Sequence, residues 1–308
     1  MRNLVIALTI SFLLAGCSSD KENHGSLNTL KTAPQTFSIN PTERASLETE
    51  GGVKVIIPPG VFVFEDGQPA LNSIQLELLD VFTKSDMILN GISTISDGRL
   101  IESFGMVFAK ATSEGKNLVI REGGAIGMEF PDRLNKSDGA LFYGHESDTS
   151  FNWEFVPGSI PETPAKVDEG ERDVQLGDAD DSVEDSRRPT GYQFLVQRLG
   201  WINCDRFVDY EEKTALEIEL SNYNTPSAYL VFRNINSVMK LYVEEKGNVI
   251  VENLPKGFKV DLVVIDNIND RYYWAKEEIT LGRQQKVTVK TKRWNLTSIK
   301  KALQELDK

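Results

Sequence analysis

Apolar and polar residues alternate in short segments along most of this chain. Residues 53–57 alternate and stop at a Pro-Pro-Gly sequence, and residues 74–78 and 126–130 alternate in the same way. A period of two places every second side chain on one face, which is typical of half-buried β-strands separated by turns. The pattern predicts an all-β first domain, a β-sandwich over residues 41–156.

A second alternating region follows a change in composition. Residues 157–190 hold four prolines, no aromatic residue and the acidic run DADDSVED, and such a segment buries too little apolar surface to offset the entropy of ordering. Alternation returns over residues 191–292, with a hairpin turn at 245–248. We therefore predict two β-sandwich domains joined by an acidic disordered linker, with the second sandwich at 191–292.

The last residues change period. Between residues 293 and 308 the apolar side chains recur at helical spacing, while lysines and Gln304 lie on the opposite side. This predicts a short C-terminal α-helix with Asn295 or Thr297 as its N-cap. Packing on the second sandwich is the favoured interpretation; a docking helix for a partner is the alternative. The members of the apolar face are Leu296, Ile299, Leu303 and Leu306.

Two segments resemble the opening of a known family. The sequence GGVKVIIPPGVF at 51–62, with SFGMVF at 103–108 and the turn at Gly115, resembles the ZU5 domain, and the likeness covers about residues 41–131. The resemblance implies a β-sandwich that acts as an interaction module without catalysis. No partner-binding residue of that family can be placed on this chain.

A weaker likeness covers about residues 225–290. The corner Leu254-Pro255-Lys256-Gly257 between two apolar segments resembles the one in transthyretin-like and carboxypeptidase-regulatory sandwiches. The resemblance implies a second small sandwich, in agreement with the alternation.

The first residues predict export. One positive charge precedes an apolar stretch over residues 4–15, which is the shape of a signal peptide and is shorter than the roughly 20 residues that span a bilayer. The sequence Leu14-Ala15-Gly16-Cys17 resembles the lipobox of bacterial lipoproteins. The resemblance implies that residues 1–16 are removed and that Cys17 carries fatty acyl chains such as palmitate. The alternative is an ordinary secretory signal that is cleaved near Cys17.

The residues after Cys17 bear on location. Residues 17–40 lack periodicity and predict a flexible tether between membrane and fold. The sequence SSDKE at 18–22 is similar to the export signal of Bacteroidota surface lipoproteins, although a solvated tether has the same composition. We therefore expect an outer-membrane lipoprotein that is either periplasm-facing or displayed on the cell surface, with the membrane as partner through the lipid on Cys17.

The charge excludes one class of partner. The chain has 34 lysine and arginine residues against 46 aspartate and glutamate residues, a formal net charge of −12. Such a chain repels nucleic acid and anionic head groups, and no basic cluster with interleaved aromatics offsets the repulsion, so we expect no nucleic-acid partner. If Cys17 is acylated, Cys204 has no partner for a disulfide, and we expect it to be buried and inert.

Few residues suggest catalysis. His24 lies in the tether, so a Ser-His-Asp mechanism has to use His145. The neighbours of His145 in Gly144–Asp148 are expected on the same loop, so they form no triad, whose members converge from separate elements. A carboxylate pair can be neither excluded nor assigned among so many acids. Two histidines cannot supply a zinc site in the folded part, and the linker acids 178–189 lack the glycine and glutamate of an EF-hand. We expect no enzyme, no metal and no cofactor; a hydrolase using His145 or a carboxylate pair is the weaker alternative.

Two aromatic residues are the candidates for ligand binding. Trp201 and Tyr273 combine a large contact area with a polar tip, and Tyr273 points outward if Tyr272 and Trp274 point into the core. The sequence predicts a non-catalytic binding or scaffolding lipoprotein with an envelope protein or a glycan as partner. Its rival is a glycan-capturing accessory lipoprotein that uses Trp201 or Tyr273.

Overall fold

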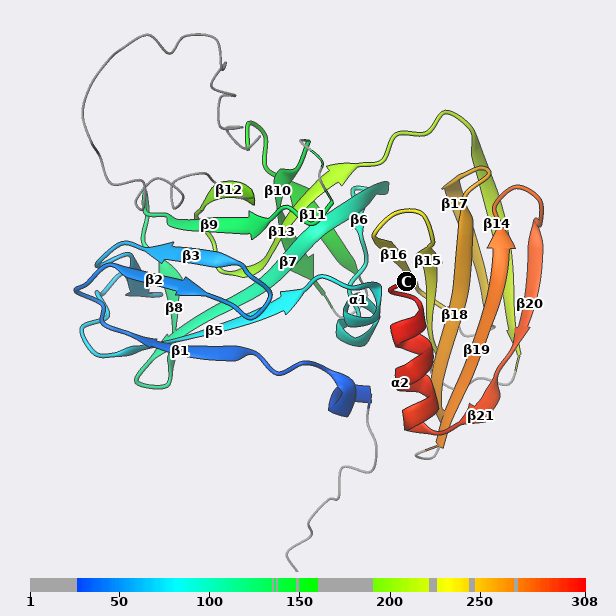
Figure 1. The fold of residues 1–308 in the computed structure, drawn as a ribbon, viewed down its shortest axis with the longest axis horizontal. Coiled ribbons are helices and arrows are strands. Elements are labelled where there is room, and N and C mark those ends of the chain that lie inside the picture. Colours follow the sequence, from blue (N-terminus) through cyan, green and yellow to red (C-terminus); the bar gives the residue numbers. More distant parts are fainter. Residues whose placement is uncertain are drawn as a thin grey trace, which may run out of the picture.

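The computed structural model describes residues 27–134, 136, 138–147, 150–159, 191–221, 226–243, 247–268 and 271–308. These residues form an all-β structure with a short C-terminal helix, which confirms the predicted fold class. Four sheets, here named A to D, lie in layers in the order B, A, D, C (Figure 1). The predicted acidic linker, 157–190, lies almost wholly outside the described residues.

The first sandwich consists of sheets A and B. In sheet A the strands follow the order β1-β5-β7-β13-β10-β11, with β4, β6 and β8 attached at the side. In sheet B the order is β12-β9-β3-β2. The strands of sheet A are β1 (Gln35–Ile39), β4 (Phe62–Phe64), β5 (Ile74–Val81), β6 (Ile95–Ser96), β7 (Arg99–Ser113), β8 (Lys116–Ile120), β10 (Ala140–Glu146), β11 (Phe151–Phe155) and β13 (Gly200–Phe207). Those of sheet B are β2 (Ala45–Glu48), β3 (Lys54–Ile57), β9 (Ile126–Pro131) and β12 (Gly191–Val196).

The second sandwich consists of sheets C and D. Sheet C has the order β17-β14-β20, with β14 and β20 parallel, and sheet D has the order β16-β15-β18-β19-β21. The strands of sheet C are β14 (Lys213–Ser221), β17 (Asn248–Pro255) and β20 (Lys286–Lys290). Those of sheet D are β15 (Ser227–Phe232), β16 (Ser237–Leu241), β18 (Lys259–Ile268), β19 (Arg271–Thr280) and β21 (Lys292–Trp294).

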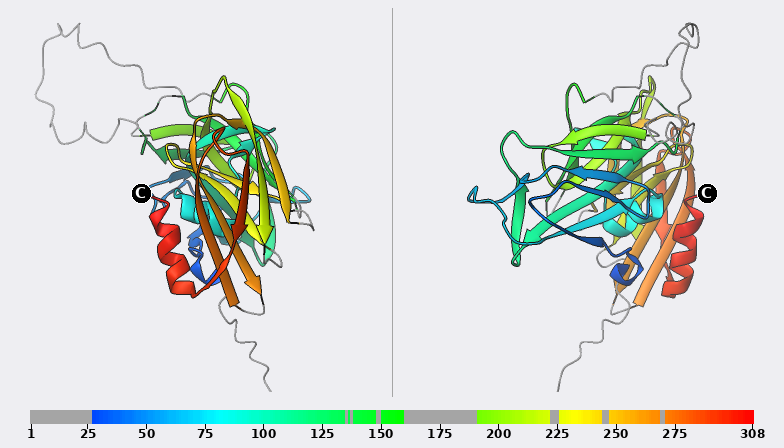
Figure 2. Two further views of the ribbon diagram at one scale, coloured as in Figure 1. Left: turned by 90° about the vertical axis from the view of Figure 1, so that its right-hand side faces the viewer. Right: turned by 60° about the vertical axis from the view of Figure 1, so that its left-hand side comes forward.

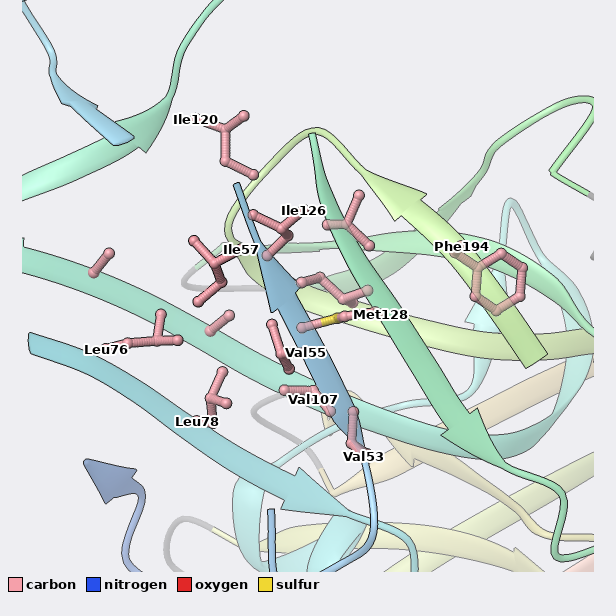
Figure 3. Packing of buried hydrophobic residues seen from close by; sticks show 14 of the residues in the cluster. Val53, Val55, Ile57, Leu76, Leu78, Val107, Ile120, Ile126, Met128 and Phe194 are labelled. Carbon is pink, nitrogen blue, oxygen red and sulfur yellow. The ribbon is translucent and has the colours of Figure 1, made fainter. Parts of the chain in front are cut away.

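Three apolar layers hold the sheets together. One lies inside each sandwich, and Figure 3 shows Val55, Leu76 and Met128 in the layer between sheets A and B. The third lies between the outer faces of sheets A and D and includes helix α1 (Lys84–Asn90) and helix α2 (Leu296–Glu305). Because sheets A and D are covered on both faces, their central strands β7 and β18 are buried along most of their length rather than in alternation.

Hydrogen bonds reinforce the third layer. The Thr94 amide donates to the Val238 carbonyl at 2.7 Å, and the Ser103 amide donates to the Asn236 carbonyl at 2.9 Å. The Asn236 side chain donates in return to the Ser103 carbonyl at 2.9 Å. The β15–β16 hairpin of the second sandwich is therefore hydrogen-bonded to the first sandwich. These hydrogen bonds satisfy buried backbone N–H and C=O groups, which would otherwise need water as a partner.

Two predicted boundaries differ from the sheets that form. We predicted the second sandwich from residue 191, but β12 pairs with β9 and β13 pairs with β7 and β10, so residues 191–207 belong to the first sandwich. We predicted a tether over residues 17–40, but a 3-10 turn, η1 (Leu27–Leu30), and strand β1 lie within it. Strand β1 is ordered by pairing with β5, a partner about 40 residues away that local composition does not reveal.

The C-terminal helix forms where it was predicted. The Asn295 side chain accepts a hydrogen bond from the Ser298 amide at 2.8 Å, so Asn295 is the N-cap. Ile299, Leu303 and Leu306 are buried in the layer shared by sheets A and D. The helix therefore packs on both sandwiches, and its apolar face is covered by the chain itself.

Candidate functional site

One row of side chains crosses the outer face of sheet B. The register pairs Ile56 of β3 and Leu195 of β12 with the same residue of β9, Gly127. Met128 and Phe194, the next residues along two of these strands, are buried in the core (Figure 3). Successive side chains in a strand alternate between faces, so the row points outward. Ile56 is 38% exposed and Leu195 is 74% exposed.

The glycine makes a notch in this row. A Cβ atom at position 127 would lie 3.4 Å from the Ile56 Cβ, which is an ordinary contact, and the glycine adopts no left-handed conformation. The strand therefore does not need glycine for its own geometry. Its effect is to leave an open space between two exposed apolar side chains.

A polar row lies beside the apolar one. Glu129 of β9 is paired in register with Lys54 and Gln193. The Lys54 ammonium lies 3.3 Å from the Glu129 carboxylate, and the Gln193 amide donates to that carboxylate at 3.0 Å. This network fixes three polar side chains along one edge of the notch.

A short segment after β11 forms a wall. The Ser159 hydroxyl donates to the Val156 carbonyl at 2.6 Å and accepts a hydrogen bond from the Leu141 amide at 2.9 Å. Together with sheet B this wall encloses a hollow of about 830 Å³, within the size range of ligand-binding clefts. We call this hollow the sheet B groove. Its lining residues include Arg44, Ser46, Lys54, Ile56, Gly127, Glu129, Val156, Ser159, Gln193, Leu195 and Gln197.

The structure does not bring the two predicted aromatic residues together. Trp201 lies in sheet A, half-buried, with its ring centre 5.1 Å from Phe108 and 6.3 Å from Phe151. Tyr273 lies in sheet D, half-buried, opposite Arg293 of β21. Neither is a fully exposed platform, and their role in ligand binding stays a prediction.

The aromatic neighbours of Tyr273 point into the core, as expected. Another tryptophan, Trp294, was not among the predicted candidates. Tyr272 and Trp274 are buried in the layer between sheets A and D. Trp294 at the end of β21 is 37% exposed and stacks on Trp274, with 5.8 Å between ring centres and 25° between ring planes. Two hollows, of about 500 and 270 Å³, are each lined in part by Trp294. The basic sequence KTKRW at 290–294 was the signal in the sequence that could have identified it.

His145 is held in a surface network. Its ring nitrogen lies 2.8 Å from the Glu154 carboxylate, which also accepts a hydrogen bond from Arg198 at 2.6 Å. Hydrogen bonds from Arg198 and then from His145 lower the pKa of Glu154. All three side chains are about half exposed, and none lines the hollows described here. This is the arrangement of a solvated ion-pair network.

The structure gathers no recognisable catalytic machinery in the part of the chain that it describes. In that part no group of three or more histidine, cysteine, aspartate or glutamate side chains is placed to hold a metal ion. The polar groups that line the sheet B groove include the Lys54–Glu129 ion pair, the Arg44 guanidinium, amides and hydroxyls, which can recognise a ligand by hydrogen bonding.

Cys204 and Asp205 lie at a bulge in strand β13. The register with β7 shifts between them, beside Gly105, whose φ is 153°. Cys204 is fully buried, as predicted, and burial raises the pKa of its thiol. Asp205 is also fully buried, and burial raises its pKa well above the ordinary value although the Asn203 amide donates to it. Its Oδ1 atom has no hydrogen-bond partner within the described residues.

The predicted lipidation site lies outside the described residues. Cys17, His24 and the acidic run 178–185 belong to segments for which the structure gives no placement. Among the helices that are described, none is long and apolar enough to span a bilayer. The sequence matches no protein-family model and no curated protein.

Proposed function

We propose that this chain is a membrane-anchored, non-catalytic binding protein whose partner occupies the sheet B groove. The observation that carries the binding role is the outward row of Ile56, Gly127 and Leu195 next to the wall at 156–159. A hydrophobic notch with a hydrogen-bonding edge, set in a hollow of ligand-binding size, is characteristic of an interaction site.

The anchor is proposed from the sequence. The resemblance of Leu14–Cys17 to a lipobox supports an acylated cysteine at the start of the mature chain, and two or three acyl chains give stable attachment where one is marginal. The outer membrane is the proposed location. The ZU5-like opening of the chain supports an interaction role without catalysis.

The lining of the groove favours a protein partner. Carbohydrates are commonly held by exposed aromatic rings. Among the described residues that line the groove the one aromatic side chain is Phe194, which is only 6% exposed. An aliphatic or aromatic side chain of a partner would fill the notch over Gly127, and its backbone would reach the polar row at Lys54, Glu129 and Gln193.

The first test is photo-crosslinking in the native cell. A photoreactive amino acid at position 195 should yield a discrete crosslinked partner. The same amino acid at Leu71, which is 76% exposed and lies away from the groove, is the matched control. The Gly127→Tyr variant, which fills the notch with a residue that strands accept, should reduce the crosslinked product at least about tenfold.

Two outcomes would contradict the binding role. Equal products from positions 195 and 71 would mean that the crosslinks report only chance collisions. A discrete product from position 195 that survives Gly127→Tyr in a folded variant would place the partner elsewhere. Circular dichroism and thermal unfolding of the purified variant establish that it is folded.

A further inference from the structure

The C-terminal part of the chain reverses the charge of the whole. Residues 271–308 hold ten lysine and arginine residues and four aspartate and glutamate residues, in a chain with a net charge of −12. Four of these cations are exposed around Trp294 and make no ion pair with a carboxylate of the described residues. We call these residues, with Trp294, the Trp294 surface: Arg271, Lys290, Lys292, Arg293 and Trp294.

The tryptophan of this surface is held in place. Its indole stacks on Trp274, which is 4% exposed, so one ring is fixed in the apolar layer and the other projects from it. Strand β21 is the edge strand of sheet D and leads directly into the N-cap of α2. A fixed indole among cations that have no carboxylate partner in the described part of the chain matches the pairing of Trp with Lys and Arg at membrane interfaces.

The surface lies at the end of the molecule where the described chain begins. In Figures 1 and 2, η1 and the junction of β21 with α2 lie at the same end, and β9 and β12 of the sheet B groove lie toward the other. Ten residue steps separate Cys17 from Leu27, and a chain of that length reaches at most about 35 Å when fully extended. A lipid on Cys17 would therefore keep this end of the molecule close to the bilayer.

We propose that the Trp294 surface binds the anionic phospholipid head groups of the membrane that anchors the chain. This inference rests on the proposed anchoring for its biological setting. One of the two hollows lined by Trp294 is also lined by Arg271 and Arg293, and the other by Lys290 and Lys292, so each presents cations to phosphate oxygens. Contact through this surface would orient the sheet B groove away from the bilayer.

The local charge overrides the repulsion expected from the net charge. At physiological ionic strength exposed charges act over about 8 Å, so acids farther than that from Trp294 act only weakly on a head group that touches it. The hollow lined by Lys290 and Lys292 also holds Glu277 and Glu305, whereas the hollow lined by Arg271 and Arg293 has no acid among its described lining residues and therefore presents the stronger positive charge.

The test uses residues 17–308 with Cys17→Ser, which carry no acyl chain and no leader. Co-sedimentation compares binding to two kinds of vesicle. One kind is pure phosphatidylcholine, and the other is phosphatidylcholine with about 30% phosphatidylglycerol, an anionic content on the order of that in natural membranes. We expect binding only to the anionic vesicles and a loss of binding in high salt. Lys290→Gln, Lys292→Gln and Arg293→Gln together should weaken binding at least about tenfold, and Trp294→Ala should weaken it severalfold.

The matched control removes the same charge elsewhere. Lys110, Lys116 and Arg121 are exposed in and beside strands β7 and β8 of the first sandwich, and changing all three to Gln should leave vesicle binding unchanged. Equal loss in both triple variants, or no dependence on phosphatidylglycerol, would overturn the inference. Binding of polygalacturonate, but not vesicles, in a Trp294-dependent manner would overturn it in favour of an acidic glycan.

The proposed lipid anchor and the proposed membrane binding by the Trp294 surface are tested by separate measurements. Because the tested protein carries no lipid, vesicle binding measures the Trp294 surface alone. The mass of the native N-terminus measures the anchor alone. A bare Cys17 together with vesicle binding would contradict the proposed anchor and support membrane binding by the Trp294 surface. Acylation of Cys17 without vesicle binding would support the anchor and contradict membrane binding by that surface.

Discussion

Replacing Leu303 with aspartate should lower the free energy of unfolding by about 4 kcal/mol or more. Leu303 is 1% exposed in the apolar layer that sheets A and D share with α2. The variant loses the packing of a buried leucine and places a carboxylate in an apolar layer, and both effects destabilise. Denaturant unfolding followed by circular dichroism measures the change.

The control for this variant lies one residue away. Gln304 is exposed on the same helix, so Gln304→Asp adds the same charge with an expected change of less than about 1 kcal/mol. If Leu303→Asp were as stable as Gln304→Asp, α2 would not be an integral part of the layer. The alternative of a docking helix for a partner would then regain support.

The second large effect concerns Asp205 and pH. Burial raises the pKa of Asp205 well above its ordinary value, so the folded protein keeps this carboxyl protonated at a pH where the unfolded chain has released the proton. A raised pKa in the folded state means that this group's contribution to stability is complete below about pH 4 and is lost as pH rises toward the folded value. The loss amounts to about 1.4 kcal/mol for each pH unit within that window.

Asp205→Asn should remove this pH dependence. The asparagine oxygen can still accept the hydrogen bond from Asn203, and the side chain no longer ionises. We expect the variant to gain stability relative to the original protein between pH 5 and 8, as measured by denaturant unfolding at each pH. Asp209→Asn, at a side chain that is 96% exposed, is the control and should follow the original protein. Parallel pH profiles for the Asp205 variant and the original protein would show that Asp205 is ionised in the fold.

Local pattern predicted the strands but not all of their partners. The alternation at 53–57, 74–78 and 126–130 corresponds to β3, β5 and β9, because period two is a property of each strand alone. Pairing is a property of two distant segments. The alternation at 192–196 is the same whether the strand joins β9 or a second sandwich, and only the fold shows that it joins β9.

The candidate sites show the same limit. Gly127 looks like any strand glycine in the sequence, and it becomes a notch only because the register places Ile56 and Leu195 on either side. Trp294 ends a three-residue strand that is too short for a clear period, so its stacking on Trp274 could not be foreseen. Asp205 and Cys204 differ in polarity, yet both are buried, because sheet A is covered on both faces, which the local sequence does not reveal.

Mass analysis of the N-terminus of the protein purified from its native membrane tests the central claim most directly. Membrane anchoring predicts a chain that begins at Cys17 and carries a diacylglyceryl group on the thiol, with a further acyl chain on the new amino group. The corresponding Cys17→Ser protein should then leave the membrane fraction. A mature chain with a free thiol at Cys17, or one that retains residues 1–16, would contradict the account.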